Sequence, residues 1–259
     1  MKIVVCVKRV PLTQEVDLAL DPEKRDVRKD NLAHVINEWD NYAVEEAVRI
    51  KEKAGGEVIA VTVGREEDEE VLRRCLAMGA DSAVRVDPDG LEPDAFVIAR
   101  ILAEVIGKVG YDLVLTGVQA DDLNEGAVGI LAAEYLGISR AAVVTGIEPE
   151  GEGARVRVEL EGGTDEMCRI PFPALLSVQT GINEPRYVSI MGIRKAAKKE
   201  LRVVNAGDLG LPEEELQART TIEEVFFPPE TGGAEILEGD PSRVAEEIIR
   251  IVREKGVNL

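Results

Sequence analysis

Apolar and polar positions along the first half of the chain form blocks that predict a strand followed by a helix, four times in succession. Each block opens with a short run that is apolar throughout, and a longer stretch follows in which apolar residues recur at helical spacing. The apolar runs cover residues 2–7, 57–63, 82–86 and 113–115. The helical stretches cover residues 39–54, 66–78, 93–107 and the segment that starts at residue 126. Strands without polar alternation are typical of a parallel sheet covered on both faces, so we expect a Rossmann-like, doubly wound α/β fold.

Beyond residue 137 the pattern changes to short strands separated by turns. The turn-like segments PEGEG and EGG lie between these strands, which predicts antiparallel strands added to the edge of the sheet. The strands cover residues 141–147, 154–160 and 165–170, and a last buried strand covers residues 174–178. From residue 203 the chain is loop-like until an amphipathic helix at residues 241–255. We expect this part to be a C-terminal arm that wraps a partner or the parent domain.

Residues 111–137 combine a strand, a polar loop and the start of a helix. In an open parallel sheet, loops that leave the carboxyl ends of strands form the ligand crevice, and free N–H groups opening the next helix suit a phosphate. The small residues Gly126, Ala127 and Gly129 would let a ligand approach the backbone closely. The loop matches neither the GxGxxG nor the Walker motif, so its pattern alone leaves a plain polar loop as an equal alternative.

The chain is strongly acidic, with a net charge of −19 and a pI near 4.6. Such a surface would repel nucleic acid and anionic membranes, which favours a protein or a small molecule as partner. Cys6, Cys75 and Cys168 are scattered and include no CxxC, so we expect reduced packing cysteines. The chain opens with strand-like residues, and no apolar run approaches the roughly 18 residues of a membrane span. We therefore expect a soluble, cytoplasmic protein.

The polar residues do not form a recognisable catalytic set. The single histidine, His34, has no serine or cysteine partner in a known motif. Asp121 and Asp122 could bind Mg²⁺, although acids in loops and at helix starts more often cap N–H groups. We expect no catalytic residues and no metal site, and the residues alone predict a nucleotide-binding α/β protein without bond-making chemistry.

One segment in the last third of this acidic chain carries a net positive charge. Residues 186–202 contain six basic side chains and one acidic side chain, Glu200. The apolar positions between them are too hydrophobic for an idle surface loop and too few for a core strand. They are Val188, Ile190, Met191 and Ile193. We expect this segment to be buried in another protein; the alternative is that Ile190 packs inside its own domain.

The segment NEPRYVSIMGIRKAAKKEL, residues 183–201, resembles the signature of the electron transfer flavoprotein β subunit. Further similarities follow the order of that family along nearly the whole chain. They are KRV near the start, His34 before Asn37, AVEEAVRIKEK, EVIAVTVG, CLAMGAD, DLVLTGVQA and GDLG. Agreement of so many ordered motifs is more specific than any one of them.

The resemblance implies a heterodimer with an α subunit that carries the electron-transferring FAD. The β chain would bind AMP in simple carriers, or a second FAD in electron-bifurcating members. By alignment, the adenine nucleotide would contact Cys6, Asn37, Glu38, Trp39, Asp40, Val63, Gly117, Val118, Gln119, Ala120, Asp121, Asp122, Leu123, Asn124, Glu125, Gly126, Ala127 and Val128. Two positions depart from the family, which commonly has Asn-Pro where this chain has Asn37-Glu38-Trp39 and a glutamine where this chain has Ala127.

The resemblance also implies a division of the chain into three parts. Residues 1–183 would be the nucleotide-binding domain, residues 184–202 the partner-recognition loop, and residues 203–259 an arm that wraps the α subunit. In that loop Ile190 would enter a pocket on the dehydrogenase, and basic residues would steer towards an acidic surface. The partner-binding residues would be Tyr187, Ile190, Met191, Arg194, Lys195, Lys198 and Lys199, with Glu159 as an acid that limits docking of the flavin domain.

The leading hypothesis is a redox carrier subunit, which passes electrons between acyl-CoA-type dehydrogenases or NADH and a downstream acceptor. Flavin would supply the chemistry, and the protein would supply position and potential. A stand-alone ATP-binding module of the universal-stress type is an alternative, but its glycine-rich phosphate loop is missing and it does not explain the arm. An ATP pyrophosphatase or ligase is a third, but no SGGxDS motif occurs. Sequence spacing leaves open whether the β site holds AMP or FAD.

Overall fold

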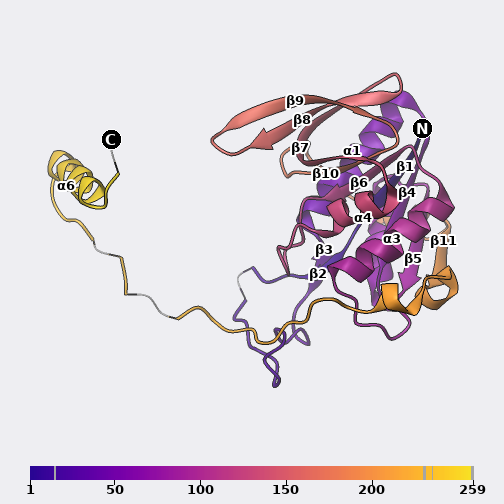
Figure 1. Ribbon diagram of the computed structural model, residues 1–259, viewed down its shortest axis with the longest axis horizontal. Helices are drawn as coiled ribbons and strands as arrows, with labels where there is room; N and C mark the ends of the chain where they lie inside the picture. The colour runs from indigo at the N-terminus through magenta and orange to yellow at the C-terminus, as the bar shows by residue number, and fades with distance from the viewer. Residues whose placement is uncertain (15, 230–231, 235, 258–259) are drawn as a thin grey trace.

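The computed structural model describes residues 1–14, 16–229, 232–234 and 236–257. Within these ranges, a nine-stranded sheet has the order β11-β5-β4-β1-β6-β10-β7-β8-β9 (Figure 1). The strands of this sheet are β1 Lys2–Cys6, β4 Glu57–Val63, β5 Ser82–Asp87, β6 Leu113–Gly117, β7 Ser139–Glu150, β8 Gly153–Leu160, β9 Thr164–Pro171, β10 Ala174–Val178 and β11 Leu201–Asn205. Neighbours from β11 to β7 are parallel, and β8 and β9 are antiparallel. The predicted parallel sheet with antiparallel edge strands is confirmed.

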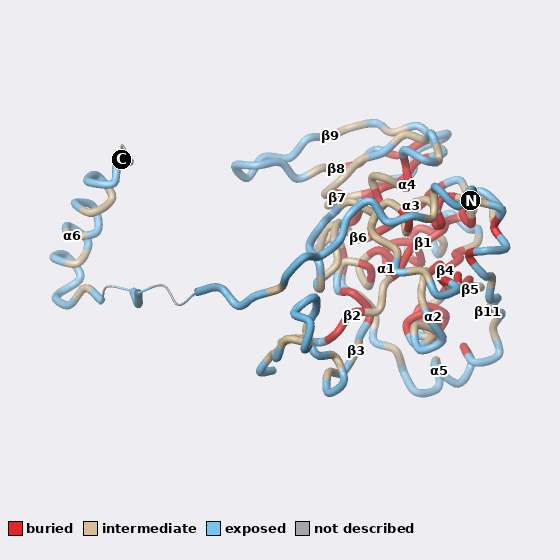
Figure 2. Tube along the Cα trace, turned by 60° about the horizontal axis from the view of Figure 1, so that its bottom comes forward, coloured by how far each residue is buried: buried red, intermediate tan, exposed pale blue. Residues whose placement is uncertain are grey.

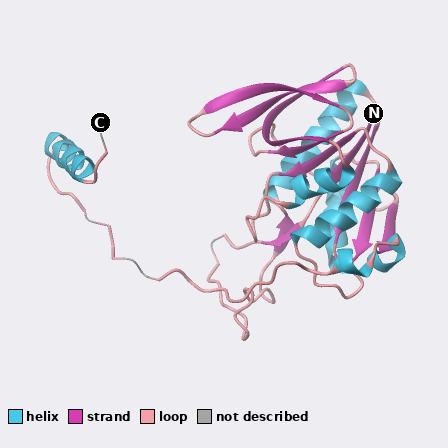
Figure 3. Cartoon of the chain, in the orientation of Figure 1, coloured by secondary structure: helices cyan, strands magenta, loops and turns pink. Residues whose placement is uncertain are grey.

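Helices cover both faces of the parallel part of the sheet (Figure 3). On one face lie α1 (Glu38–Ala54), α2 (Glu69–Met78) and the short α5 (Ile190–Ala196). On the other face lie α3 (Ala95–Val109) and α4 (Val128–Leu136). This doubly wound arrangement explains why the central strands β1, β4 and β6 are apolar on both faces over most of their length.

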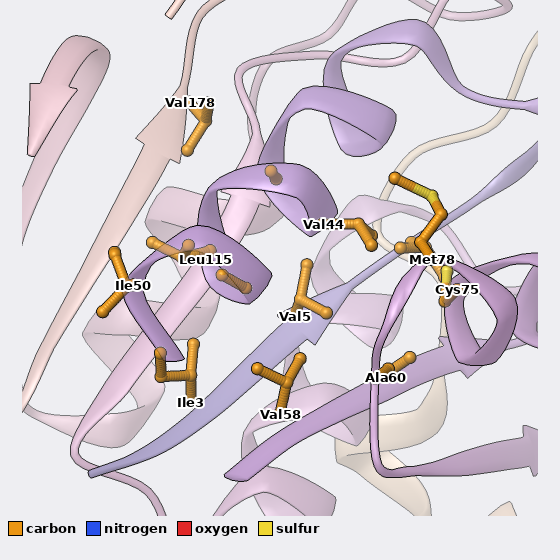
Figure 4. Close-up of a cluster of buried hydrophobic side chains, with 14 of the residues drawn as sticks. Ile3, Val5, Val44, Ile50, Val58, Ala60, Cys75, Met78, Leu115 and Val178 are labelled. Atoms are coloured by element: carbon orange, nitrogen blue, oxygen red, sulfur yellow. The ribbon is translucent and has the colours of Figure 1, made fainter. Parts of the chain in front are cut away.

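Successive side chains of the central strand β1 enter different cores, because a strand points them to opposite faces. Ile3 and Val5 belong to the core under α1 and α2, whereas Val4 and Cys6 belong to the core under α3 and α4. Figure 4 shows the first of these cores, where Ile3 and Val5 lie among side chains of α1, α2 and the neighbouring strands. Neither face could accept a charged residue without a partner.

The chain changes direction across the sheet at β1. From β1 it proceeds to β4 and then β5 on one side, and it returns through α3 to β6 on the other side of β1. The carboxyl ends of β1 and β6 therefore flank the switch point, which is where open α/β sheets bind ligands. A two-stranded sheet of β2 (Arg9–Pro11) and β3 (His34–Ile36) follows directly after β1 and delivers the chain into α1.

Two predicted elements need correction. The loop expected from residue 203 is wrong at its start, because β11 pairs in parallel with β5 as an edge strand. Two 3₁₀ helices, Ala206–Leu209 and Glu213–Leu216, follow β11, and the first of them contributes Ala206 and Leu209 to the core beside α3. The helix expected to resume at residue 126 begins at Val128, since Gly126 has a positive φ of 60°.

The chain beyond residue 216 forms an arm with few contacts to the sheet. Its first part is attached at two places: Asp94 accepts the N–H groups of Arg219 and Thr220, and Val225 N–H donates to Lys24 O at 2.7 Å. The helix α6 (Pro241–Glu254) has no buried residue and lies apart from the sheet in Figures 1 and 2. None of the described helices is long and apolar enough to span a membrane.

Candidate functional site

Three segments meet at the switch point between β1 and β6. They are the residues that follow β1, the turn that opens α1, and the loop of residues 118–127 between β6 and α4. Side chains of the α1 turn, Asn37 and Asp40, hold the other two segments in place. We call this junction of loops the crevice, after the position at which open α/β sheets bind ligands.

Asp40, in the first turn of α1, joins the ends of β1 and β6. Its carboxylate accepts the backbone N–H of Lys8 at 2.8 Å and that of Gly117 at 3.0 Å. Only 6% of Asp40 is exposed, and this burial, opposed by the hydrogen bonds, raises its pKa to about 7. Gly117 is required beside it, because a Cβ there would lie 2.5 Å from the carboxylate of Asp40 and 2.6 Å from Cβ of Trp39.

Asn37, the residue before α1, holds the loop of residues 118–127. Its buried amide Nδ2 donates to the carbonyl of Gln119 at 2.8 Å, and its Oδ1 accepts the N–H of Asp121 at 3.0 Å. The carboxylate of Asp121 in turn accepts the N–H of Glu38 at 3.3 Å. The side chains of Asn37 and Asp40 thus act as positioning groups for the loops on either side of the crevice.

The start of α4 has the features of an anion-binding turn. Asn124 and Gly126 have positive φ angles of 53° and 60°, and Ala127 at the cap position offers no side-chain acceptor to the first N–H groups of the helix. The hydroxyl Oγ1 of Thr116 is buried without a hydrogen-bond partner, and a Cβ on Gly129 would lie 2.5 Å from it. Free N–H groups and an unsatisfied hydroxyl at one helix start fit the phosphate of a nucleotide.

Charge around the crevice comes from both sides. The ammonium of Lys8, after β1, forms an ion pair with Asp122 of the loop at 2.7 Å. Asp121 and Asp122 therefore contact an N–H group and an ammonium, and no cluster of three or more His, Cys, Asp or Glu side chains suited to a metal occurs among the described residues. Burial, and then the charge of Asp40, raises the pKa of Cys6 to about 12, so its thiol is neutral at the end of β1.

The structure gathers the predicted nucleotide residues at one edge of the sheet. Val63 ends β4 beside β1, and the indole N–H of Trp39 donates to Oε1 of Gln179 at 2.8 Å. Within the loop, Val118 N–H donates to Val178 O at 3.1 Å. The remaining loop residues, Ala120, Leu123 and Glu125, lie between these anchored points and α4, and Val128 is the first residue of α4. Lys8, Thr116 and Gln179 were not predicted as site residues, although all three stand at or just beyond the end of a strand.

Residues 187–199, which we call the docking segment, expose large apolar side chains on and before α5. Tyr187 is 91% exposed, Ile190 71% and Met191 67%. Ile190 therefore does not pack inside its own domain. Arg194, Lys195 and Lys198 are also exposed and line, with Met191, a shallow hollow of about 340 Å³. Lys199 differs from them, because its ammonium donates to Leu76 O and Ala80 O at the end of α2.

Glu159 lies far from the docking segment, on the antiparallel strand β8. Its carboxylate accepts from Nε2 of Gln179 at 3.4 Å, and Gln179 also holds the indole of Trp39. Glu159 is thus linked through Gln179 to Trp39 of the crevice, and not to the basic side chains of α5.

These features define a doubly wound α/β protein with a crevice of backbone donors at its topological switch point. Comparison with known proteins identifies the family. The model of the electron transfer flavoprotein domain matches residues 27–209, which is more than half of the chain. The chain belongs to the electron transfer flavoprotein family, in which it corresponds to the β subunit.

Full-length similarity supports this placement. The chain is 42% identical over 261 residues to the electron transfer flavoprotein subunit beta of Methylophilus methylotrophus, covering 98% of both chains. It is 37% identical over 255 residues to the protein of that name from Bacillus subtilis, again covering 98% of both chains. The human protein of that name is 33% identical over 261 residues, which cover 99% of this chain and 98% of the human chain.

Proposed function

We propose that this chain is the β subunit of a heterodimeric electron carrier and that its crevice binds the phosphate-bearing part of an adenine nucleotide. The observation that carries the nucleotide site is the start of α4, where the uncapped N–H groups and the unpartnered hydroxyl of Thr116 lie together. Flavin bound by the α subunit supplies the redox chemistry. The β chain holds the nucleotide and positions the partner surfaces.

The crevice residues divide into two roles in this proposal. Backbone N–H groups of residues 126–129 bind the phosphate, which explains why small residues stand there. Asn37 and Asp40 hold the loops that present those groups, and Lys8 supplies a cation at the mouth of the crevice. The ligand is AMP in a simple carrier or a second FAD in a bifurcating one.

The nucleotide content of the purified heterodimer tests this proposal. Denaturation releases the bound ligands, and chromatography counts flavin and AMP per heterodimer. One FAD and one AMP would indicate a simple carrier, and two FAD without AMP would indicate bifurcation. A heterodimer with one FAD and no further adenine nucleotide would refute the β site.

The docking segment is proposed to bind an acyl-CoA-type dehydrogenase or another flavin enzyme, with Ile190 as the apolar anchor. An exposed aliphatic side chain flanked by cations is suited to a pocket with an acidic rim. Ile190→Ala should slow electron transfer to the dehydrogenase and leave the nucleotide content unchanged. Val203→Ala, which truncates an exposed residue of β11, is the matched control. Equal transfer rates in the two variants would refute the anchor.

A further inference from the structure

The docking segment is exposed in its middle and fastened at both ends. On its N-terminal side it follows Asn183 and Arg186, which bind to α1. On its C-terminal side it ends at Ala196 and Lys199, which bind to α2. The apolar residues Tyr187, Ile190 and Met191 lie between these attachments and contribute little to the protein's own core.

The N-terminal attachment is a single arginine held between two carboxylates of α1. Arg186 donates to both oxygens of Glu45, from Nε at 2.8 Å and from a terminal nitrogen at 3.0 Å. It also donates to both oxygens of Glu52, at 2.8 and 3.1 Å, and its backbone N–H donates to Glu45 at 3.1 Å. Glu45 is 4% exposed, so this carboxylate is buried and depends on its cation.

Asn183 reinforces this attachment through two neighbouring residues of α1, Tyr42 and Glu46. Its amide nitrogen donates to Tyr42 O at 3.1 Å and to the carboxylate of Glu46 at 3.0 Å, and both Asn183 and Glu46 are buried. The C-terminal attachment uses Lys199, which donates to two carbonyls at the end of α2, and Arg73, which donates to Lys199 O at 3.2 Å. Each attachment combines charged donors with fixed acceptors.

Two of the carboxylates in these contacts, those of Glu45 and Glu46, are buried, and buried carboxylates are costly to maintain. The contacts of Asn183 and Arg186 with α1 fix the direction in which the chain moves away from the surface of this helix, immediately before Tyr187. Without this restraint, a short apolar segment could adopt many conformations, and a partner would have to order it on binding. A guanidinium fork suits this purpose because it binds two carboxylates in one plane, whereas a lysine ammonium cannot.

We propose that Arg186 is a positioning residue for partner docking: fixed between Glu45 and Glu52, it holds the docking segment in its binding conformation before the partner arrives. This inference rests on the proposed docking of a dehydrogenase at Ile190. It adds that the affinity of the docking surface depends on a residue that the partner need not touch. When the guanidinium of Arg186 is lost, the affinity for the dehydrogenase should fall, while the rate of electron transfer within the bound complex should be unchanged.

The test uses the complete heterodimer with Arg186→Lys, which keeps the charge and removes the fork. We expect the KM for the dehydrogenase to rise roughly tenfold with kcat unchanged, and amide exchange of residues 187–195 to accelerate. Arg100→Lys is the matched control, because Arg100 is also held between two carboxylates, Glu104 and Glu215, on the opposite face of the sheet. The control should leave both readouts unchanged.

A second variant covers the case in which Arg186→Lys does not fold. Glu52→Gln removes the half-exposed carboxylate and leaves the pair of Arg186 with Glu45 intact, so a smaller rise in KM of about threefold is expected. The double variant with Ile190→Ala should show strong non-additivity, because an already truncated anchor gains little from correct presentation. A kcat effect, an unchanged KM, or full additivity with Ile190→Ala would overturn the positioning role. An unaltered KM in Ile190→Ala alone would instead refute the proposed docking site.

Discussion

Replacement of Asp40 by asparagine tests how the crevice is held together. The carboxylate accepts two backbone N–H groups, from Lys8 and Gly117, and these bonds favour the ionised form. Burial favours the neutral form and is the larger effect, since the pKa of Asp40 rises from 3.8 to about 7. Asparagine resembles the neutral acid in shape and does not titrate, although its amide nitrogen cannot accept the second of these N–H groups.

The sign of the pH effect follows from the raised pKa. The folded protein binds the proton of Asp40 more tightly than the unfolded chain, so the stability that this group contributes is complete below the unfolded pKa and is lost as pH rises through about 7. Between about pH 5.5 and about pH 8 the free energy of unfolding should fall by about 2 kcal/mol from this group alone. Asp40→Asn should lack that loss. Its stability relative to the parent should therefore improve by about 2 kcal/mol over this range.

Urea unfolding at both pH values, followed by tryptophan fluorescence, measures the difference. Trp39 is the single tryptophan of the chain and lies next to Asp40, so the signal reports on the crevice. Other titrating groups contribute equally to parent and variant and cancel in the comparison. A constant difference between the two proteins would refute the raised pKa. A constant difference is also what is expected if the two N–H bonds outweigh burial, because Asp40 would then be ionised in the folded and the unfolded state throughout this pH range.

Two further predictions concern the loop and the arm. Gly126→Val should cost about 1–2 kcal/mol through its positive φ and should lower the adenine nucleotide content of the heterodimer, whereas Gly162→Val, in an open turn with a similar φ, should leave that content unchanged. Deletion of residues 218–259 should leave the sheet folded, because β11 and both 3₁₀ helices after it are kept, but co-purification with an α subunit should be lost. Normal nucleotide content in Gly126→Val, or normal co-purification of the shortened chain, would contradict these predictions.

The sequence pattern predicts the sheet well because local hydrophobicity determines most of it. The central strands are apolar on both faces over most of their length, which is typical of a doubly covered parallel sheet. The edge strand β11 was missed because its sequence LRVVN carries polar residues and none of its residues is fully buried. This strand forms by pairing with β5, which lies more than 100 residues earlier in the chain, and a local sequence pattern does not contain such a contact.

The position of the candidate site can be predicted from the sequence, but the hydrogen bonds by which its side chains hold the loops cannot. A strand followed by a polar loop and a helix locates the crevice from local pattern alone. The pairing of Asp40 with Gly117, however, joins residues 77 positions apart, and only the folded sheet brings them together. The same limit applies to Lys199, whose charge resembles that of its exposed neighbours although its ammonium points to α2.

The helix α1 connects the two surfaces that the proposals assign to different ligands. Its first turn holds the crevice through Asp40, and its second and fourth turns hold the docking segment through Glu45 and Glu52. An α-helix rises about 1.5 Å per residue, so Asp40 and Glu45 are about 7.5 Å apart along the helix axis. Because both attachments are made to one rigid element, the position of a docked partner is fixed relative to the nucleotide. Arg186→Lys should therefore loosen the docking segment without moving the crevice, and it should leave the nucleotide content of the heterodimer unchanged.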